Sequence, residues 1–336
     1  MQTSPSTPAS PAVEDDEAGP RANGEGHVTA LRVASALFAT VSGAVRGKDE
    51  AVKLALVALL SGSHLLVEDV PGTGKTLLGK SLAAAIGGRF GRVQCTPDLL
   101  PSDLTGTSIY ASATGSWDFR PGPVFANVVL VDEVNRASPR TQAALLEPME
   151  ERQVTVDGVT HALPDPCFMI ATQNPVGTTG TFPLPESQLD RFGLVLTMGL
   201  PGRDAEREIL TGVGGAAVLP SLESVTNPVE LRAVISEVRR VYCASAVLEY
   251  VLDIAAAVRV HPDVVLGASP RATLALFHAA QAHATLSRRH FVTPDDVKAV
   301  APSVLAHRLV FSTGVDVASG HATVATIIDS LATPRP

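Results

Sequence analysis

Short apolar runs recur along residues 64–197, and mixed segments of helix or loop length separate them. The runs fall at 64–68, 92–95, 128–131, 168–171 and 194–197. Strands that are apolar at nearly every position are typical of a parallel sheet that is buried on both faces. The pattern therefore predicts an α/β domain, with a five-stranded parallel sheet flanked by helices. Ligands bind to such sheets at the carboxyl ends of the strands.

From residue 201 onwards the apolar positions follow helical spacing, and two helix starts carry clear capping signals. Asn227 precedes Pro228 and Thr293 precedes Pro294, and each pair is followed by an acidic residue at the third helical position. A capping side chain followed by proline marks the start of a helix. We therefore expect a small all-helical domain over 201–331.

The two ends of the chain and one internal segment have patterns of their own. Residues 1–26 are rich in Pro, Ser, Ala and acidic side chains, so we expect a disordered tail there, and we assign 332–336 to a second short tail. The α/β domain is therefore expected over 27–200, with two helices before its first strand. An alternating run around Asp157-Gly158 predicts a β-hairpin.

Composition supports two ordered domains and narrows the class of protein. A chain of 336 residues exceeds the size at which one core keeps growing. Because 45% of the residues are hydrophobic but only 4% are aromatic, the core must consist mainly of Ala, Val and Leu. A net charge of −8 disfavours a protein whose main task is to neutralise DNA phosphates.

The cysteines and the hydropathy of the chain indicate in which cellular compartment the protein resides. Cys95, Cys167 and Cys243 are scattered and odd in number, which favours buried free thiols in a reducing cytosol. The sequence has no run of about 18 uncharged apolar residues, and its N-terminal segment is acidic. We therefore expect a cytoplasmic protein without membrane insertion.

A glycine-rich loop follows the first predicted strand and precedes a helix. Successive N–H groups in such a loop bind phosphate oxygens, Lys75 would reach the β- and γ-phosphates, and the Thr76 hydroxyl would ligate Mg²⁺. Asp69 stands where the pattern G-x-x-x-x-G-K-[ST] has its first glycine. The residues expected to contact the nucleotide in this segment are Asp69, Val70, Pro71, Gly72, Thr73, Gly74, Lys75, Thr76 and Leu77.

Polar residues end the third and fourth predicted strands. The run 128–131 is followed by Asp132 and Glu133, and we expect Asp132 to hold Mg²⁺ through water and Glu133 to polarise the attacking water. Asn174 follows the fourth strand, where its amide could hold that water or the γ-phosphate. An Asn-Pro turn without a catalytic role is the alternative.

Two arginines outside the loop are further candidates. Arg191 lies far from the phosphate loop in the sequence and is suited to act as a charge-stabilising finger for a neighbouring subunit. Arg271 falls in the first turn of a helix that Ser269 would cap. A cation there opposes the helix dipole, so a phosphate partner would explain it, and a solvated surface arginine is the alternative.

With these residues assembled, the chain resembles the AAA+ ATPases, and within them the MoxR family, over about residues 28–331. The resemblance rests on the segments 66–76, 96–106, 119–127, 131–137, 171–175 and 185–192. It implies that Lys75 and Thr76 belong to Walker A, Asp132 and Glu133 to Walker B, Asn174 to sensor 1 and Arg271 to sensor 2, and that Arg191 is the arginine finger.

The same resemblance implies further architecture and partners. An insert is expected at about 100–124 and a hairpin before sensor 1 at about 153–163. Such proteins typically form hexameric rings that remodel protein clients, often with a partner that contains a von Willebrand factor A-type domain. Ring interfaces would then account for Arg191 and would involve Arg136 and Arg140.

Two positions depart from the family pattern that the chain resembles. Gly47 is expected on the adenine side of the nucleotide, but Lys48 stands where the family usually has Gln, which leaves the adenine contact open. Pro148 replaces a common small residue. Neither position belongs to the expected γ-phosphate machinery.

The sequence therefore favours a Mg²⁺-dependent ATPase, with ATP and Mg²⁺ as cofactors, that acts as a chaperone-like ring. One alternative is a DNA motor or helicase loader, which the acidic composition and the lack of a nucleic-acid module disfavour. A second alternative is a small-molecule kinase. Asp132, Glu133 and a candidate finger favour water as the acceptor over such a substrate.

Overall fold

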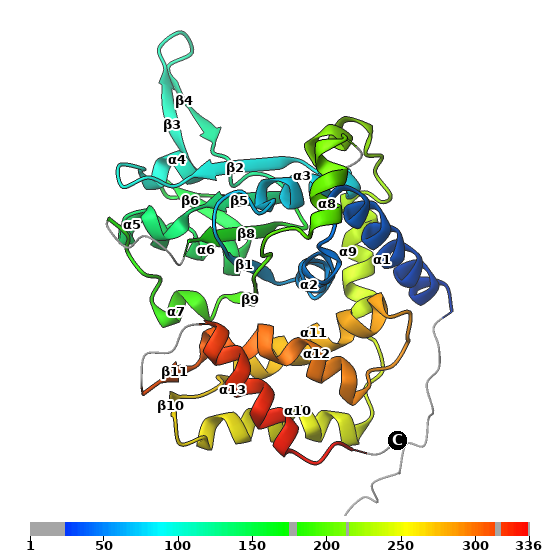
Figure 1. Cartoon of the computed structure of the whole chain (residues 1–336). Coiled ribbons are helices and arrows are strands. Elements are labelled where there is room, and N and C mark those ends of the chain that lie inside the picture. The colour runs from blue at the N-terminus through cyan, green and yellow to red at the C-terminus, as the bar shows by residue number, and fades with distance from the viewer. Residues whose placement is uncertain (1–23, 175–179, 213–214, 313–316, 335–336) are drawn as a thin grey trace, which may run out of the picture.

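The computed structural model describes residues 24–174, 180–212, 215–312 and 317–334 (Figure 1). The tail expected over 1–26 lies outside the described residues except for its last three positions. These three begin the first helix, whose first turn carries Glu25 in the place where a helix dipole favours an acidic group. Ring contact between His27 and His290 also anchors this end of the helix.

The first unit carries the sheet. Its elements are α1 (Gly24–Ala44), α2 (Asp49–Leu60), β1 (His64–Glu68), α3 (Lys75–Ala85), β2 (Phe90–Gln94), α4 (Pro101–Thr105), β3 (Gly106–Ala111), β4 (Ser116–Pro121), β5 (Val128–Asp132), η1 (Val134–Arg136), α5 (Pro139–Ala143), α6 (Leu146–Glu151), β6 (Gln153–Val156), β7 (Val159–Ala162), β8 (Phe168–Gln173), α7 (Glu186–Leu189) and β9 (Phe192–Leu196).

The predicted five-stranded parallel sheet is confirmed. Its strand order is β2-β5-β8-β1-β9, and neighbouring strands pair in parallel. Strands β2 and β9 begin two residues earlier than their apolar runs indicated, because pairing with a neighbour extends each strand beyond its most apolar stretch. The order brings the carboxyl ends of β5, β8 and β1 side by side.

Alternate strand residues enter two separate buried clusters. Leu65 and Val67 pack with helices α1, α2 and α3, whereas Leu66 packs with Val129 and Val131 on the other face. Both faces of the sheet are therefore buried, as uninterrupted apolar strands require. The clusters consist mainly of Ala, Val and Leu.

Two hairpins lie outside the main sheet. β3 and β4 pair within the expected insert and extend away from the body of the molecule (Figure 1). β6 and β7 form the hairpin predicted around Asp157-Gly158, and both turn residues have positive φ, of 51° and 77°. Two positive φ angles are what a tight type I′ turn requires.

The second unit is mainly helical. Its elements are α8 (Arg203–Leu210), η2 (Gly215–Ser221), α9 (Pro228–Val238), α10 (Ser245–Val260), β10 (Val264–Leu266), α11 (Pro270–Leu286), α12 (Pro294–Leu305), η3 (Ala306–Arg308), β11 (Val310–Phe311) and α13 (Val317–Ser330). Strands β10 and β11 form a short antiparallel pair, which the helical spacing of the sequence does not indicate. Strands of two or three residues are too short to show an alternating pattern.

The predicted helix caps are present. The Asn227 side chain accepts hydrogen bonds from two N–H groups of the first turn of α9, and Thr293 and Asp296 form a reciprocal capping box on α12. Ser269 caps α11 by accepting from the N–H of Ala272. Local sequence signals thus fix where these helices of the second unit begin.

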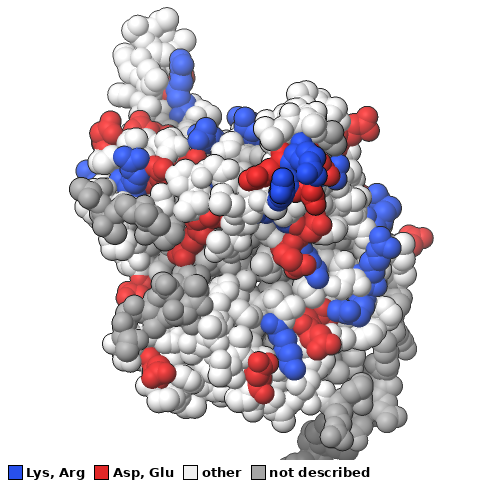
Figure 2. Space-filling model, viewed as in Figure 1, with Lys and Arg blue, Asp and Glu red and all other residues white. Residues whose placement is uncertain are grey.

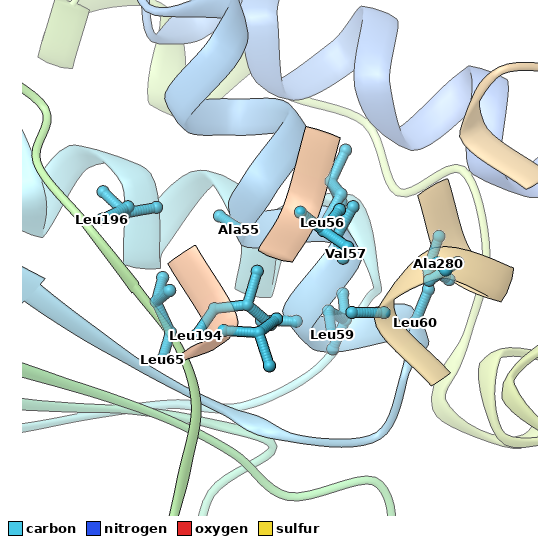
Figure 3. Close-up of a cluster of buried hydrophobic side chains, with 14 of the residues drawn as sticks. Ala55, Leu56, Val57, Leu59, Leu60, Leu65, Leu194, Leu196 and Ala280 are labelled. Carbon is cyan, nitrogen blue, oxygen red and sulfur yellow. The ribbon is translucent and has the colours of Figure 1, made fainter. Parts of the chain in front are cut away.

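Helix α2 joins the two units into one continuous core. Figure 3 shows Ala55, Leu56 and Leu59 of α2 among side chains of the sheet and of the second unit. Leu65, Leu194 and Leu196 come from β1 and β9, and Ala280 comes from α11 (Figure 3). The second unit is therefore packed against the sheet edge formed by β9. In the described part of the chain, no helix is long and apolar enough to cross a membrane.

Candidate functional site

The glycine-rich loop connects β1 to α3 in the conformation that its glycines permit. Gly72 and Gly74 have φ angles of 85° and 98°, in the left-handed region that favours glycine. Helix α3 begins at Lys75, and its N-cap residue is Gly74, which has no side chain to cap it. The N–H groups of the first turn are therefore available to an anion.

A cavity of about 370 Å³ lies over this loop. It brings together the loop, the two carboxylates that end β5 and the asparagine that follows β8. The lining residues are Pro71, Gly72, Gly74, Lys75, Thr76, Leu77, Arg92, Asp132, Glu133 and Asn174. Of the residues predicted to contact the nucleotide, Gly47, Asp69, Val70, Thr73 and Arg271 do not line it.

A larger cavity, of about 470 Å³, lies between the two hairpins. It is lined by Ser108, Trp117, Phe119, Asp157, Val159 and His161. The lining contains no lysine or arginine, and none of its residues begins a helix. The chemistry of phosphate binding therefore belongs to the smaller cavity.

Lys75 is held at the entrance of the loop. Its Nζ donates to the backbone carbonyl of Asp69 at 2.6 Å. Burial lowers the pKa of Lys75, and the nearby carboxylates of Asp69, Asp132 and Glu133 oppose that shift. The lysine is therefore a partly desolvated cation beside acidic groups, which suits it to bind phosphate oxygens.

Asp69, at the position of the missing first glycine, has a structural role. It is only 5% exposed, and its carboxylate accepts from the N–H of Val70 at 2.7 Å and from that of Gly199 at 2.5 Å. The side chain thus ties the loop to the segment that follows β9. This explains why an aspartate is accommodated where the common pattern has glycine.

Lys48 ties a second element to that same segment. The side chain is buried, and its Nζ donates to the carbonyl oxygens of Met198, Gly199 and Leu200 at 2.8, 2.8 and 2.5 Å. An ammonium group has three N–H donors, so these contacts use all of them. Lys48 therefore stabilises the strand end, and the adenine contact left open by the sequence does not fall to its amino group in this conformation.

One hydroxyl contacts both acidic residues at the end of β5, through the Asp132 carboxylate and the Glu133 backbone. Thr172 Oγ1 donates to Asp132 Oδ1 at 2.7 Å and accepts from the backbone N–H of Glu133 at 2.9 Å. Glu133 has a φ of 56°, which is uncommon for a residue with a side chain and concentrates at functional sites. Arg136 pairs with Glu133 Oε2 at 2.8 Å.

Arg92 and Thr172 are cavity neighbours that the sequence reading missed. Arg92 Nη2 pairs with Asp132 Oδ2 at 2.9 Å from the adjacent strand β2. Only the strand order makes them neighbours of Asp132, and a parallel sheet does not reveal that order in its sequence. For Thr172, the available signal was a polar residue near the carboxyl end of an otherwise apolar strand. Arg92 lies in the middle of β2 and carries no such signal.

Arg191 and Arg271 lie together, outside the cavity lining. Arg191 Nη1 pairs with Glu150 Oε2, and Arg271 Nη2 pairs with Glu150 Oε1 at 2.7 Å. Arg271 Nη1 is also 3.9 Å from Asp190 Oδ2. Burial lowers the pKa of Arg191, and the charge of Arg271 adds to that shift. Carboxylates are thus the partners of Arg271 in this structure, at a position where the sequence suggested phosphate.

Comparison with known proteins finds similarity to ATPases in both units of the fold. Residues 64–194 match the model of the ATPase family associated with various cellular activities (AAA), and residues 256–328 match the AAA lid domain. The chain is 38% identical to Chaperone MoxR1 of Mycobacterium tuberculosis, over 90% of this chain and 81% of that protein. It is 31% identical to Protein MoxR of Paracoccus denitrificans, over 82% of this chain and 87% of that protein.

A solved structure extends the likeness to three dimensions. A candidate ATPase from Cytophaga hutchinsonii superimposes with a TM-score of 0.84 at 32% identity, covering 93% of this chain and 98% of that one. The chain is also 49% identical to the uncharacterized protein YeaC of Bacillus subtilis, over 78% of this chain and 82% of that protein. Both units of the fold are therefore shared with proteins of known structure.

Proposed function

Because the chain belongs to the MoxR family of AAA+ ATPases, we propose that it binds ATP with Mg²⁺ in the cavity over the glycine-rich loop and hydrolyses it. The observation that supports this most directly is the convergence of Lys75, Asp132 and Glu133 on one cavity. Lys75 begins α3, whereas Asp132 and Glu133 lie at the end of β5, far from it in the sequence. Their convergence matches the needs of phosphoryl transfer to water.

Each cavity residue has a distinct proposed role. The N–H groups of the loop and Lys75 bind the phosphates, and Thr76 and Asp132 supply a hydroxyl and a carboxylate oxygen for Mg²⁺. When bound, Mg²⁺ would neutralise charge on the β- and γ-phosphate oxygens. Glu133 polarises the attacking water, and Asn174 holds that water or the γ-phosphate.

The oxygen groups in the cavity suit a Mg²⁺ ion that takes its remaining ligands from water and from the nucleotide phosphates. Within the described ranges, no group of three or more His, Cys, Asp or Glu side chains is placed to hold a metal ion. Mg²⁺ characteristically binds through one or two protein oxygens, with water and substrate phosphates as its other ligands. Thr76 and Asp132 both lie in the cavity lining, where the Thr76 hydroxyl would bind the ion directly and Asp132 would hold it through water.

Arg191 and Arg271 support action between subunits. Neither lines the cavity of its own chain, and both pair with the Glu150 carboxylate, so the two cations lie next to each other. We propose that Arg191 reaches the nucleotide of a neighbouring subunit in a ring, which we expect to be hexameric, and that Arg271 acts from the same face. Arg136 already pairs with Glu133 of its own chain, and Arg140 is exposed and could meet a neighbour.

The proposed cellular task is the remodelling or maturation of protein partners in the cytoplasm. Its support is the name of a relative, Chaperone MoxR1. A partner with a von Willebrand factor A-type domain remains an expectation from the family resemblance. The DNA-motor alternative gains no support from Figure 2, where basic and acidic side chains are mixed across the visible face.

The test compares two substitutions in the cavity. Glu133→Gln should retain ATP but lower kcat by about 10³-fold, because the amide cannot act as a base towards water. Lys75→Ala should lose nucleotide binding itself. Phosphate release without any added acceptor, and binding of a fluorescent ATP analogue, measure the two properties. Normal turnover by either variant would contradict the assignment.

Two further measurements address the alternatives and the client. A titration with single- and double-stranded DNA at physiological salt tests the DNA-motor reading, which predicts tight binding. Affinity capture with Glu133→Gln in the presence of ATP, with Lys75→Ala as the matched control, would identify proteins bound only by the nucleotide-loaded state.

A further inference from the structure

One arginine of the helical unit is buried against the strand that follows Arg191. Arg308, at the end of η3, is only 7% exposed. Its Nε donates to Asp190 Oδ1 at 2.9 Å. Its Nη2 donates to the carbonyl oxygens of Phe192 at 2.8 Å and Asp190 at 3.2 Å.

Two further hydrogen bonds use the remaining N–H donors of the guanidinium group. Nη1 of Arg308 donates to the carbonyl of Gly193 at 3.2 Å and to that of Val304, in the preceding helix α12, at 2.6 Å. Apart from Val304, every acceptor lies within residues 190–193. Arg308 therefore bonds the backbone on both sides of Arg191 and leaves the Arg191 side chain itself uncontacted by these bonds.

Asp190 collects additional contacts from the helical unit. Ser269 Oγ, at the cap of α11, lies 3.3 Å from both carboxylate oxygens of Asp190. Arg271 is 3.9 Å from the same carboxylate, and a ring nitrogen of the buried His307 is 3.0 Å from the Phe192 carbonyl. Two separate parts of the helical unit thus hold the segment that carries Arg191.

Because all the N–H groups of the Arg308 guanidinium are hydrogen-bonded, the group couples the position of η3 to that of residues 190–193. Its donors form a planar fork with fixed directions, unlike the flexible ammonium of lysine. Burial of the charge is compensated by the Asp190 carboxylate and by the carbonyls. A shift of η3 would therefore move residues 190–193, and Arg191 with them.

We propose that Arg308 is a positioning residue for Arg191, through which the helical unit sets how Arg191 presents its charge to the nucleotide of a neighbouring subunit. The inference rests on the proposed function, since it requires Arg191 to act in hydrolysis. A positioning role differs from a purely structural one, because a substitution of Arg308 should lower the rate of hydrolysis only by displacing Arg191.

The test is a double-mutant cycle on hydrolysis. Arg308→Lys keeps the charge and can reach Asp190, but it cannot bridge both flanks of Arg191. We expect kcat to fall about 10-fold or more, while the Kd for ATP stays within about twofold, because the nucleotide cavity is untouched. In an Arg191→Ala background, Arg308→Lys should cause no further loss.

The control is another arginine that links the two units. Arg239 donates to the Ser61 carbonyl at 3.2 Å, on the side of α2 and away from residues 190–193. Arg239→Met should keep kcat within about twofold. Arg308→Met gives the stronger form of the test, and if that variant does not fold, Arg308→Lys and Asp190→Asn decide the question.

The outcomes separate the two proposals. If Arg191→Ala hydrolyses ATP normally, the proposed role of Arg191 fails and this inference fails with it. If Arg191→Ala is defective but Arg308→Lys is not, only the inference is overturned. Multiplicative losses in the double variant, or a weakened ATP affinity that accompanies the loss of kcat, would show that Arg308 is structural only.

Discussion

The molecule holds its two sets of candidate catalytic groups in different ways. In the cavity, Lys75 and the Asp132 carboxylate bond to a backbone carbonyl and a hydroxyl next to the strand ends of their own sheet, and the backbone N–H of Glu133 bonds to that same hydroxyl. Arginines of the same chain, Arg92 and Arg136, pair with the two carboxylates. Arg191 and Arg271 instead pair with a carboxylate and lie outside that cavity.

This difference indicates what each set is built to do. The Asp132 carboxylate bonds to a hydroxyl on the neighbouring strand of the same sheet, so its position does not depend on a second chain, as preorganised catalysis requires. Arginines that rest on an exchangeable carboxylate can leave it for a stronger anion such as a phosphate. This difference favours a site assembled from two chains.

The largest expected effect comes from Arg191. Arg191→Ala should bind ATP normally but lose about 10³-fold in kcat, which is the usual loss when an arginine finger is removed. Mixing this variant with Lys75→Ala should restore part of the activity, because Lys75→Ala chains still supply the arginine. Steady-state phosphate release from the mixture measures the effect. No recovery, in rings shown to contain both variants, would break the two-chain comparison.

A smaller effect is expected within the cavity, from the Thr172 hydroxyl, which bonds the Asp132 carboxylate and the Glu133 backbone. Thr172→Val keeps the shape of the side chain but removes the contacts to Asp132 and Glu133. We expect kcat to fall by about 10-fold, and stability to fall by about 1–2 kcal/mol from the lost buried hydrogen bonds. Unlike Arg191→Ala, this variant should gain nothing from mixing.

Thr141→Val provides the matched control for that prediction. Thr141 is also buried, and its hydroxyl donates to the Leu99 carbonyl at 2.7 Å, away from the carboxylates. A similar loss of stability with normal kcat would show that the Thr172 effect is specific to the site. Equal losses of kcat in both variants would mean that the cavity responds to general destabilisation.

The two regions also differ in how far sequence could predict them. The glycine loop, Asp132, Glu133 and Asn174 each follow an apolar strand directly, so local pattern and the general rule for parallel sheets placed them on one edge. The caps at Asn227, Ser269 and Thr293 were similarly local. Such features depend on neighbours within a few residues.

Contacts that depend on packing between distant segments were not predictable in this way. Arg92 meets Asp132 only because β2 is placed beside β5, and Lys48 contacts the segment that follows β9 across 150 residues of sequence. Arg308 is a similar case, since nothing near it in the sequence indicates burial against residues 190–193. Strand order and interdomain packing decide these contacts, and neither is written as a local pattern.

The smallest effect is expected from Glu150, the carboxylate on which both arginines rest. Its side chain is 35% exposed, and exposed ion pairs contribute only about 0–1 kcal/mol. If phosphate is the working partner of Arg191, Glu150→Gln should change kcat by less than about threefold, with a similarly small change in stability. Phosphate release and thermal unfolding measure the two quantities.

Glu151→Gln is the matched control for this last prediction, since Glu151 is the next residue and its carboxylate accepts from Gln153 at 3.1 Å. Both variants remove one negative charge from the same helix end, so a difference between them isolates the contact with the arginines. A loss in Glu150→Gln as large as that in Arg191→Ala would make Glu150 part of the working geometry. The contrast between a preorganised cavity and an exchangeable arginine face would then have to be abandoned, because both faces would depend on fixed partners within one chain.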